Sequence, residues 1–592
     1  MPPRRRSASK VGRRPLAELG VPLAPRWLLV GCFFITFTLP NLVFSGLFFY
    51  DTLHVMKWAV TLAPLAVLGA VAGFRLLRFG AGATRFRLDG FTVLWLALLL
   101  FVTVQPLWAP PRSWMTFFRE WLCFASLWLT YVLARHGADG RLVRALLWGA
   151  LVNAAINVLF AEVQVRGLNG PFFFMANVAG HYIGNTGQQN MFALWMAVTG
   201  TGGLALLLSA DDRRPALTGV LVALLAVVFW GLAGSTSRSG ILSLAAAAVV
   251  LGAFRLRLRG RRELPAILAV TAMFFAVLGL NMAVNESRRA ALLYKLEDVF
   301  ERPLSLANRD SIWATSWTMF TKAPVRGVGL GQFKWNYIDA QNEMLKRWPH
   351  FKWQYTHWAH NEFLQWMAES GIFGAALMFF LWGWWMWGLF RAFFRRTELS
   401  AETLWGSALV ALFFVNALWT RPFHRIENVI WLALAFAVTN REMLLEILPV
   451  PAAERFERRG RLLGGVICAV CLAGLVYLGD GLYTNRHMRA ATAEELSNDE
   501  VWVMLQRVHR SPMMRDEAEK QMGYFKVSLG ELNEDAVLLA EGLNDLVDFF
   551  MKQPDTKELN YLIQWAGKLG DEEFFNFVDS FVYRPSTDES GE

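Results

Sequence analysis

Apolar residues occur in long runs along most of this chain, from about Trp27 to about Leu478. A membrane-spanning helix needs roughly 20 mostly apolar residues, and runs of about this length recur. We predict spans near residues 27–49, 56–74, 91–108, 114–134, 142–162, 191–210, 216–234, 239–254, 265–284, 362–390, 402–419, 428–440 and 462–479. The pattern indicates an all-α, polytopic membrane protein with about 12–13 transmembrane helices.

Arginine-rich segments fall on every second connection between these spans. They cover residues 4–14, 75–87, 135–144, 213–214, 255–262, 391–396 and 455–461. Cationic side chains are retained on the cytoplasmic side of a membrane, so we expect a basic cytoplasmic N-terminus over residues 1–26. An odd number of spans then places the C-terminus and a long loop, residues 285–361, on the periplasmic side.

The residues after the last span have a different character. Residues 491–592 carry 9 Lys+Arg against 22 Asp+Glu, although the whole chain has a formal net charge of +10. Val501, Met504, Leu505 and Val508 recur at helical spacing. We therefore predict a polytopic domain over 27–480, a small helical extramembrane domain over 482–585, for which tetratricopeptide-like repeats are one interpretation, and a disordered tail over 586–592.

Composition excludes several classes of function. With 55% hydrophobic and 18% charged residues, the 592-residue chain is too apolar for a soluble fold. The four cysteines lie inside apolar stretches, no His/Cys/Glu set has metal-ligand spacing, and no P-loop is present. We expect no metal, no cofactor and no nucleic-acid partner.

Two histidines stand at the predicted entrance to the span over 362–390. His357 and His360 belong to the segment Tyr355–Gln365, in which Asn361 and Glu362 follow at once. Histidine is the side chain best suited to accept a proton near neutral pH. A catalytic base is one interpretation, and polar residues that cap a helix are the other.

Arginines near the predicted membrane surface are candidates for binding phosphate. Arg238 lies in a short Ser-rich turn between two spans, Arg309 begins an amphipathic helix, and Arg326 precedes a glycine-rich turn. A guanidinium binds phosphate oxygens in pairs, so Arg238 and Arg309 together suit a diphosphate. Snorkelling arginines and glycines that only form tight turns are the alternatives.

Two further external segments offer polar side chains. The turn Gly184–Asn190 ends in Gln189 and Asn190, whose amides suit sugar hydroxyls or phosphate as well as ordinary turn formation. The connection Thr420–Asn428 contributes His424, with Arg421 and Arg425 beside it.

Together these motifs resemble the O-antigen ligase and polymerase superfamily of multi-span, GT-C-type glycosyltransferases. The resemblance covers about residues 180–380 and rests on the order of four motifs. These are Gly-Asn-x-x-Gln-Gln-Asn, Ser-x-Ser-Arg, Arg-x-x-x-Trp followed by Pro-x-x-Gly-x-Gly, and His-Asn-x-x-Leu-Gln. Relatives often show His-x-His-Asn, whereas His357 precedes His360 by three positions here, which leaves the role of His357 open.

The resemblance implies a function at the periplasmic face of the bacterial inner membrane. His360 looks like the essential histidine of the family, and Arg238 and Arg309 look like its phosphate-binding arginines. The donor would be an undecaprenyl diphosphate-linked glycan in the membrane lipid, attacked in a metal-independent single displacement. The expected residues are catalytic His360, Arg238 and Arg309 and substrate-binding His357, Asn361, Gln189, Asn190, Arg326 and His424.

The acceptor stays open at this point. Lipid A-core would make the protein a ligase, another glycan a polymerase, and a protein hydroxyl an O-oligosaccharyltransferase. A different class, a lipid-linked glycan flippase or other transporter, also suits about thirteen spans, although no repeat between the two halves of the chain supports it.

Overall fold

The computed structural model describes residues 21–583, except 85, 87–88, 179, 209–214, 302–308, 444–452 and 494. Within these residues the chain is helical, and its only extended pairing is an isolated bridge between Val21 and Thr84. The all-α class is confirmed. The basic stretch before residue 21, the pair Arg213 and Arg214, and the end predicted as disordered (586–592) lie outside the described residues.

Every predicted span coincides with a helix. These are α1 (Arg26–Thr38), α2 (Val55–Ala83), α3 (Gly90–Val104), α4 (Trp114–Gly137), α5 (Gly140–Val165), α6 (Gln189–Leu208), α7 (Pro215–Gly234), α8 (Arg238–Arg259), α9 (Leu264–Val284), α13 (Glu362–Arg395), α14 (Ala401–Ala417), α15 (Ile426–Asn440) and α16 (Ala453–Ala493). Eight stretches among the described residues are long and apolar enough to cross a membrane, and one of them holds both α8 and α9. α1, α14 and α15 are shorter apolar helices. The protein is therefore a multi-pass membrane protein.

One predicted span is wrong in length. The expected span 27–49 ends as a helix at Thr38, and Gly46–Phe48 forms only a short 3-10 turn. Pro40 explains the early end, because a proline restricts the residue before it and cannot donate a helical hydrogen bond.

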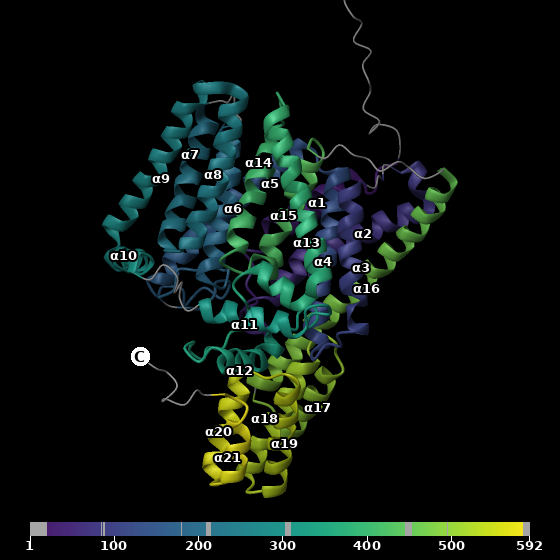
Figure 1. Ribbon diagram of the computed structural model, residues 1–592, viewed down its shortest axis with the longest axis vertical. Helices are drawn as coiled ribbons and strands as arrows, with labels where there is room; N and C mark the ends of the chain where they lie inside the picture. The colour runs from purple at the N-terminus through teal and green to yellow at the C-terminus, as the bar shows by residue number, and fades with distance from the viewer. Residues whose placement is uncertain are drawn as a thin grey trace, which may run out of the picture.

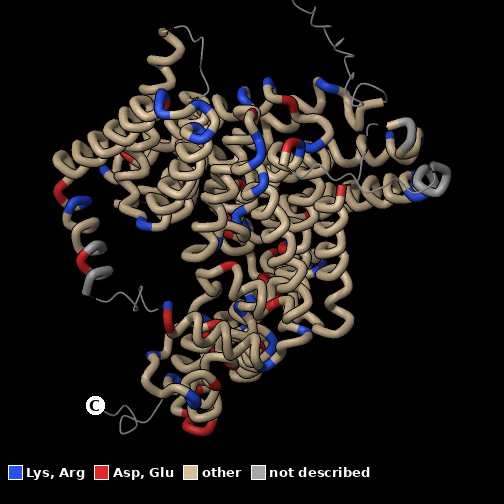
Figure 2. Tube along the Cα trace, turned by 45° about the horizontal axis from the view of Figure 1, so that its top comes forward, with Lys and Arg blue, Asp and Glu red and all other residues tan. Residues whose placement is uncertain are grey.

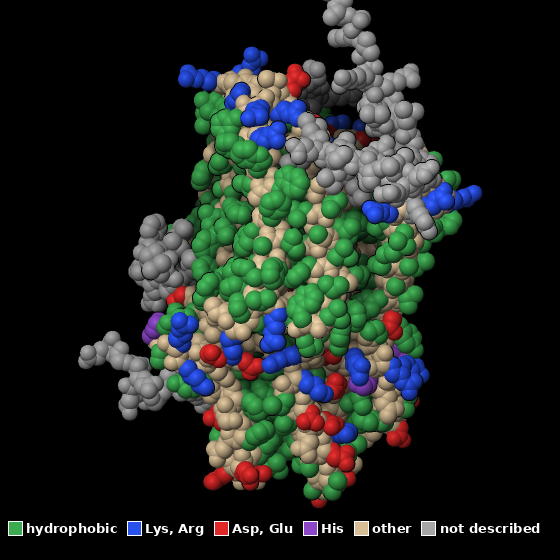
Figure 3. All heavy atoms as spheres, turned by 45° about the vertical axis from the view of Figure 1, so that its right-hand side comes forward, with side chains coloured by type: hydrophobic (Ala, Val, Ile, Leu, Met, Phe, Trp, Pro, Cys, Tyr) green, Lys and Arg blue, Asp and Glu red, His purple; other side chains and the backbone are tan. Residues whose placement is uncertain are grey.

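The spans form a bundle with a helical tail at one end (Figure 1). On the face drawn in Figure 3, a hydrophobic belt covers the bundle, and charged side chains gather at the two ends of the belt. The turn between α8 and α9, which includes Arg261 and Arg262, lies at the end away from the tail. Helix α16 runs alongside α2 and continues without interruption into the tail, so the boundary expected at 480–482 falls inside one helix.

In the long connection before α13, helices α11 and α12 lie between the bundle and the tail, and α10 lies beside the end of α9 (Figure 1). It forms α10 (Glu286–Glu301), α11 (Arg309–Lys322) and α12 (Tyr337–Arg347). The tail consists of α17 (Asn498–His509), α18 (Arg515–Leu532), α19 (Ala536–Lys552), α20 (Thr556–Leu569) and α21 (Glu572–Asp579). Ile338 of α12 packs in one apolar cluster with Leu543 and Phe550 of α19, which joins the connection to the tail. Acidic residues mark the tail helices in Figure 2.

Helix α13 is kinked at Gly371, whose φ of 65° favours glycine. The glycine-rich turn after Arg326 docks on this kink. Val328 N–H donates to the Ala368 carbonyl at 3.0 Å, and a Cβ on Gly327 would lie 2.1 Å from the Glu369 carbonyl oxygen. The turn amides of Val328, Gly329 and Gly331 all donate to α13. These amides serve packing against α13, which agrees with the interpretation that the glycines only form a tight turn.

Candidate functional site

His360 is held in an unusual backbone conformation directly before α13. Its φ is 52°, in the left-handed region that non-glycine residues seldom adopt. The next residue, Asn361, accepts hydrogen bonds from the amides of Phe363 and Leu364 at 3.1 Å each and so caps α13. The cap fixes where the helix begins, and the strained residue before it is the kind of outlier found at functional sites.

Arg238 begins α8 directly after a tight turn. Ser237 caps the helix through the Gly240 amide, and Thr236 has a φ of 49°. Gln189 donates to the Ser235 carbonyl and to the Thr236 hydroxyl, the latter at 3.0 Å, while Asn190 accepts from the Ser237 hydroxyl at 3.0 Å. Gln189 and Asn190 therefore support the turn that presents Arg238.

Arg309 begins α11, which is tied to the segment that carries His360. Trp313 Nε1 donates to the Ala359 carbonyl at 3.2 Å, and the Ser311 hydroxyl donates to the Lys352 carbonyl at 3.0 Å. Burial, and then the nearby charge of Arg238, lower the pKa of Arg309 below its ordinary value. Two arginines from separate elements thus lie close enough to repel each other.

His360 lies beside Arg309 and Arg421. Burial and the charges of these two arginines lower the pKa of His360 to about 4, so the imidazole is neutral at neutral pH. Arg421 donates to the Gln188 side-chain oxygen at 2.8 Å, and its guanidinium lies 4.8 Å from the centre of a Trp358 ring. We call Arg238, Arg309, His360 and Arg421 the cationic cluster. A half-buried set of guanidinium groups with a neutral base among them suits an anionic ligand such as a diphosphate.

His424 lies in a buried carboxylate network. Its Nδ1 is 3.0 Å from Glu120 Oε2, and its Nε2 is 3.3 Å from Glu362 Oε2 and 3.0 Å from Gln365 Nε2. Burial alone would lower the pKa of His424, but the charges of Glu120 and Glu362 outweigh it and raise this pKa well above the ordinary range. The His424 ring packs at a tilt of 44° against Trp358, with the ring centres 4.2 Å apart, and Trp358 also contacts Arg421. His424 is therefore a positively charged residue that is connected to the cationic cluster through Trp358.

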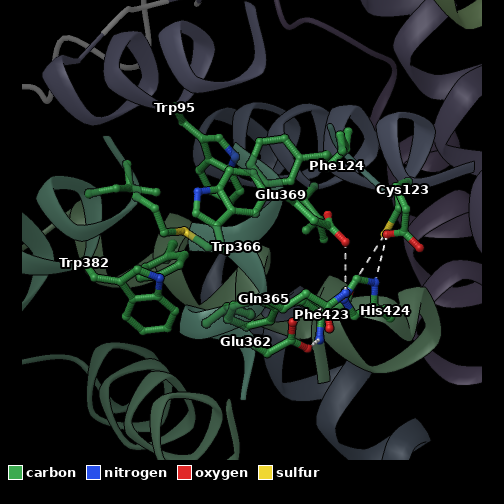
Figure 4. Close-up of a pocket in the computed structure, with 18 residues that line it drawn as sticks. Trp95, Cys123, Phe124, Glu362, Gln365, Trp366, Glu369, Trp382, Phe423 and His424 are labelled. Carbon is green, nitrogen blue, oxygen red and sulfur yellow. Dashed lines mark hydrogen bonds and ion pairs between the residues drawn. The ribbon is translucent and has the colours of Figure 1, made fainter. Parts of the chain in front are cut away.

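A small cavity opens beside His424 on the bundle side. Figure 4 shows Glu362, Gln365 and Glu369 gathered around His424, with the indoles of Trp366 and Trp382 lining the apolar part. Its volume is about 70 Å³, too small for a sugar ring and a diphosphate together. The cationic cluster suits such a ligand better than this cavity does.

The remaining expected residues lie in different surroundings. His357 Nε2 is 3.3 Å from Asp555 Oδ2 of the tail, so it points to the tail interface. Arg326 is exposed, and its carbonyl accepts a hydrogen bond from Gln105 at 3.1 Å. Asn361, Gln189 and Asn190 are bonded to backbone or turn groups as described above. The structure brings together His360, Arg309 and Arg238 and leaves Arg326 outside the cluster.

The sequence did not identify several residues that lie next to the candidate site. Glu120 lies inside the predicted span 114–134, and an ionisable residue there was a usable signal of function. Trp358 and Asp555 carried no such signal, since only the folded chain brings them to Arg421 and His357. Among the described residues, no group of three or more His, Cys, Asp or Glu side chains is placed to hold a metal ion.

The central part of the chain matches a known protein family. Residues 220–379 match the family model described as O-Antigen ligase, a range that includes Arg238, Arg309 and His360. No curated protein matches the sequence. The matched family implies a membrane glycosyltransferase-like enzyme with a role in glycan transfer of the ligase or polymerase type. The match covers about a quarter of the chain and, together with the apolar helices, supports the relation of this multi-pass membrane protein to the O-antigen ligase-like superfamily.

Proposed function

We propose that this protein transfers a glycan from an undecaprenyl diphosphate carrier to an acceptor hydroxyl at the periplasmic face of the bacterial inner membrane. The observation that carries the proposal is the neutral His360 beside Arg309 and Arg421, with Arg238 next to Arg309. These groups match the two requirements of the reaction, a base for the acceptor and cations for the leaving group.

The reaction is a single displacement. The acceptor oxygen forms a bond to the anomeric carbon of the donor sugar while the bond from that carbon to the diphosphate oxygen breaks. His360 takes the hydroxyl proton, and the electron pair of the broken bond stays on the diphosphate, whose charge the arginines stabilise. The guanidinium groups supply the charge that a divalent ion supplies elsewhere, so the step is metal-independent.

Donor binding also prepares the base. The charges of Arg309 and Arg421 lower the pKa of His360 in the free protein. A bound diphosphate places negative charge against the same arginines, which raises the pKa of His360 toward its ordinary value. The imidazole of His360 becomes basic enough for catalysis only when the donor is bound, so it does not activate a hydroxyl while the site is without donor.

The distribution of arginine supports the proposed periplasmic placement. The connection that carries Arg261 and Arg262 lies at the end of the bundle away from the tail, and the positive-inside rule assigns such connections to the cytoplasm. The polytopic domain over 27–480 would then carry the transferase site at its periplasmic end, formed largely by the loop 285–361. The helical domain over 482–585 would be periplasmic as well.

Reconstitution in lipid vesicles tests this function against its main alternative, a lipid-linked glycan flippase. The vesicles contain an undecaprenyl diphosphate glycan, and lipid A-core, a free glycan or a serine-rich peptide is added as the acceptor. Transfer predicts that a glycosylated acceptor and undecaprenyl diphosphate appear together. If the donor crosses the bilayer intact and no acceptor is modified, the protein is a transporter. The acceptor that reacts separates the ligase from the polymerase and the protein O-oligosaccharyltransferase.

A further inference from the structure

A second cavity lies at the end of the bundle away from the tail, between the last turns of α13 and the start of α3. Its volume is about 410 Å³, within the range of about 300–1,000 Å³ typical of small-molecule sites. Arg257 of α8 donates to the Phe394 carbonyl at 3.5 Å, so this end of α13 lies beside the end of α8, close to the turn between α8 and α9. We call the cavity the basic cavity, because its lining includes Arg391, Arg395 and Arg396.

The three arginines of the basic cavity carry positive charge that no carboxylate balances within the described part of the chain. Arg391 and Arg395 lie one helical turn apart on α13, and their side chains are exposed and have no hydrogen bond or ion pair with described residues. Arg396 donates only to a backbone oxygen, the Glu442 carbonyl, at 3.0 Å. Like charges one turn apart repel each other, so an anion between them stabilises this end of α13.

Asp89, a carboxylate that also lines the basic cavity, does not neutralise these arginines. Its Oδ1 accepts from the Thr92 amide at 2.7 Å, and its Oδ2 accepts from the Tyr131 hydroxyl at 3.1 Å. Arg135 of α4 forms an ion pair with the same carboxylate at 3.4 Å. Asp89 is thus buried and engaged by α3 and α4, and the lining keeps an excess of positive charge.

Aromatic rings connect the basic cavity to the hydrophobic surface of α13. Trp384 and Trp387 line the cavity, and Trp384 packs so closely on Gly90 that a Cβ there would lie 2.4 Å from the indole. Phe380, one turn nearer the middle of the span, is 61% exposed, and its ring centre is 5.9 Å from that of Trp384. Tryptophan is enriched where membrane helices meet the lipid headgroups, so the cavity lies at the boundary between headgroups and acyl chains.

We propose that the basic cavity binds the phosphate headgroup of an anionic phospholipid. The phosphate oxygens accept from the guanidinium groups of Arg391 and Arg395, and the acyl chains lie along Phe380 and Trp384. Basic pockets at the cytoplasmic ends of membrane helices bind anionic headgroups through the same chemistry. A free phosphate would use the arginines but not the aromatic rings, which is why the lipid is the better ligand.

This lipid site is separate from the transferase site. The basic cavity and His360 lie near opposite ends of α13. In the orientation proposed above, the bound lipid belongs to the cytoplasmic leaflet, so it is not the glycan donor. The site therefore stands or falls independently of glycan transfer.

Native mass spectrometry of the full-length protein, released from detergent, tests the proposal. The protein is titrated with dioleoylphosphatidylglycerol, with dioleoylphosphatidylcholine, which has the same chains without net charge, and with glycerol phosphate, which has the anion without chains. Phosphatidylglycerol is expected to bind most tightly. Each arginine near the membrane surface contributes about a fivefold gain in affinity for an anionic lipid, so the double variant Arg391→Gln/Arg395→Gln weakens phosphatidylglycerol binding by about twenty- to thirtyfold.

The double variant Arg261→Gln/Arg262→Gln is the matched control. It removes the same charge from exposed positions at the same end of the bundle but outside the cavity, and its affinity for phosphatidylglycerol stays near that of the wild type. An equal loss in the two double variants would mean that only the general surface charge attracts the lipid, and the proposal would be wrong.

Two further results overturn the proposal. Phosphatidylcholine binding as tightly as phosphatidylglycerol would show that the arginines do not select the headgroup, and glycerol phosphate binding as tightly would show that the ligand is a free phosphate. If Arg391→Gln/Arg395→Gln does not yield a monodisperse protein, Arg395→Gln alone, at the exposed last residue of α13, predicts a loss of about fivefold. An unchanged affinity in that variant also contradicts the site.

Discussion

The pKa of His360 in the absence of donor offers a quantitative test of the cationic cluster. Burial and the charges of Arg309 and Arg421 lower this pKa from 6.5 to about 4. Burial contributes most, Arg309 next and Arg421 least. Arg421 is the weaker of the two charges, so Arg421→Gln raises the pKa of His360 by only a fraction of this depression. Arg309→Gln raises it by more.

The titration can be followed directly. Full-length protein in nanodiscs is labelled with 13C at the histidine ring, and the His360→Asn variant assigns the signal. The account predicts a pKa near 4 in the wild type, a higher value in Arg421→Gln, and the highest value in Arg309→Gln. Arg347→Gln, at an exposed position of α12, is the matched control and leaves the pKa unchanged. A wild-type pKa near 6.5, or no difference between Arg421→Gln and Arg347→Gln, refutes the reasoning.

The same argument predicts two different pH dependences in the steady state. The acidic limb of kcat/KM reports the free protein and falls at low pH, near the depressed pKa of His360. The acidic limb of kcat reports the donor complex, where the diphosphate offsets the arginine charges, so it falls at a higher pH. If the acidic limbs of kcat and kcat/KM fall at the same pH, the donor diphosphate does not reach the arginines beside His360.

Further predictions concern the leaving group, the tail and the reaction course. Arg309→Lys keeps the positive charge but loses the two parallel N–H donors of the guanidinium, so the rate of undecaprenyl diphosphate release falls by at least about tenfold. A rate equal to that of the wild type contradicts a bidentate role for Arg309. Asp555→Asn removes the ion pair with Lys334 and lowers the free energy of unfolding by about 1–3 kcal/mol in thermal melts. The pKa of Asp555 is depressed in the folded protein. The stability difference between wild type and Asp555→Asn is therefore fully present above the unfolded pKa of about 3.9 and is lost as the pH falls from there through the folded pKa. A chelator leaves transfer unchanged, and NMR of the product shows inversion at the anomeric carbon; retention would exclude a single displacement.

The sequence predicted the membrane helices well because long apolar runs have few other solutions in a bilayer. Its one clear error, the span expected over 27–49, came from weighing hydropathy above Pro40, which ends α1. The alternation of basic connections also predicts which ends of the helices share one side of the membrane. Both predictions use only neighbouring residues along the chain, so they do not require knowledge of how the helices pack.

The site could be predicted only in part. The sequence placed Arg238, Arg309 and His360 on one side of the membrane, but it could not show that Arg309 lies beside both of the others. Nor could it show that Trp358 contacts His424 and Arg421, or that Asp555 of the tail reaches His357. These contacts depend on tertiary packing between segments far apart along the chain, which periodicity does not report.

Acceptor-dependent release of undecaprenyl diphosphate, measured together with glycosylated acceptor, tests the central claim most directly. The account predicts that His360→Ala and Arg309→Ala each reduce both signals in parallel by at least about a hundredfold, as the loss of a base or an anion-stabilising group does elsewhere. His350→Ala and Arg347→Ala, exposed positions in the same connection, serve as matched controls and keep the wild-type rate. Wild-type transfer by His360→Ala or Arg309→Ala would contradict the assignment of the cationic cluster as the site of glycan transfer.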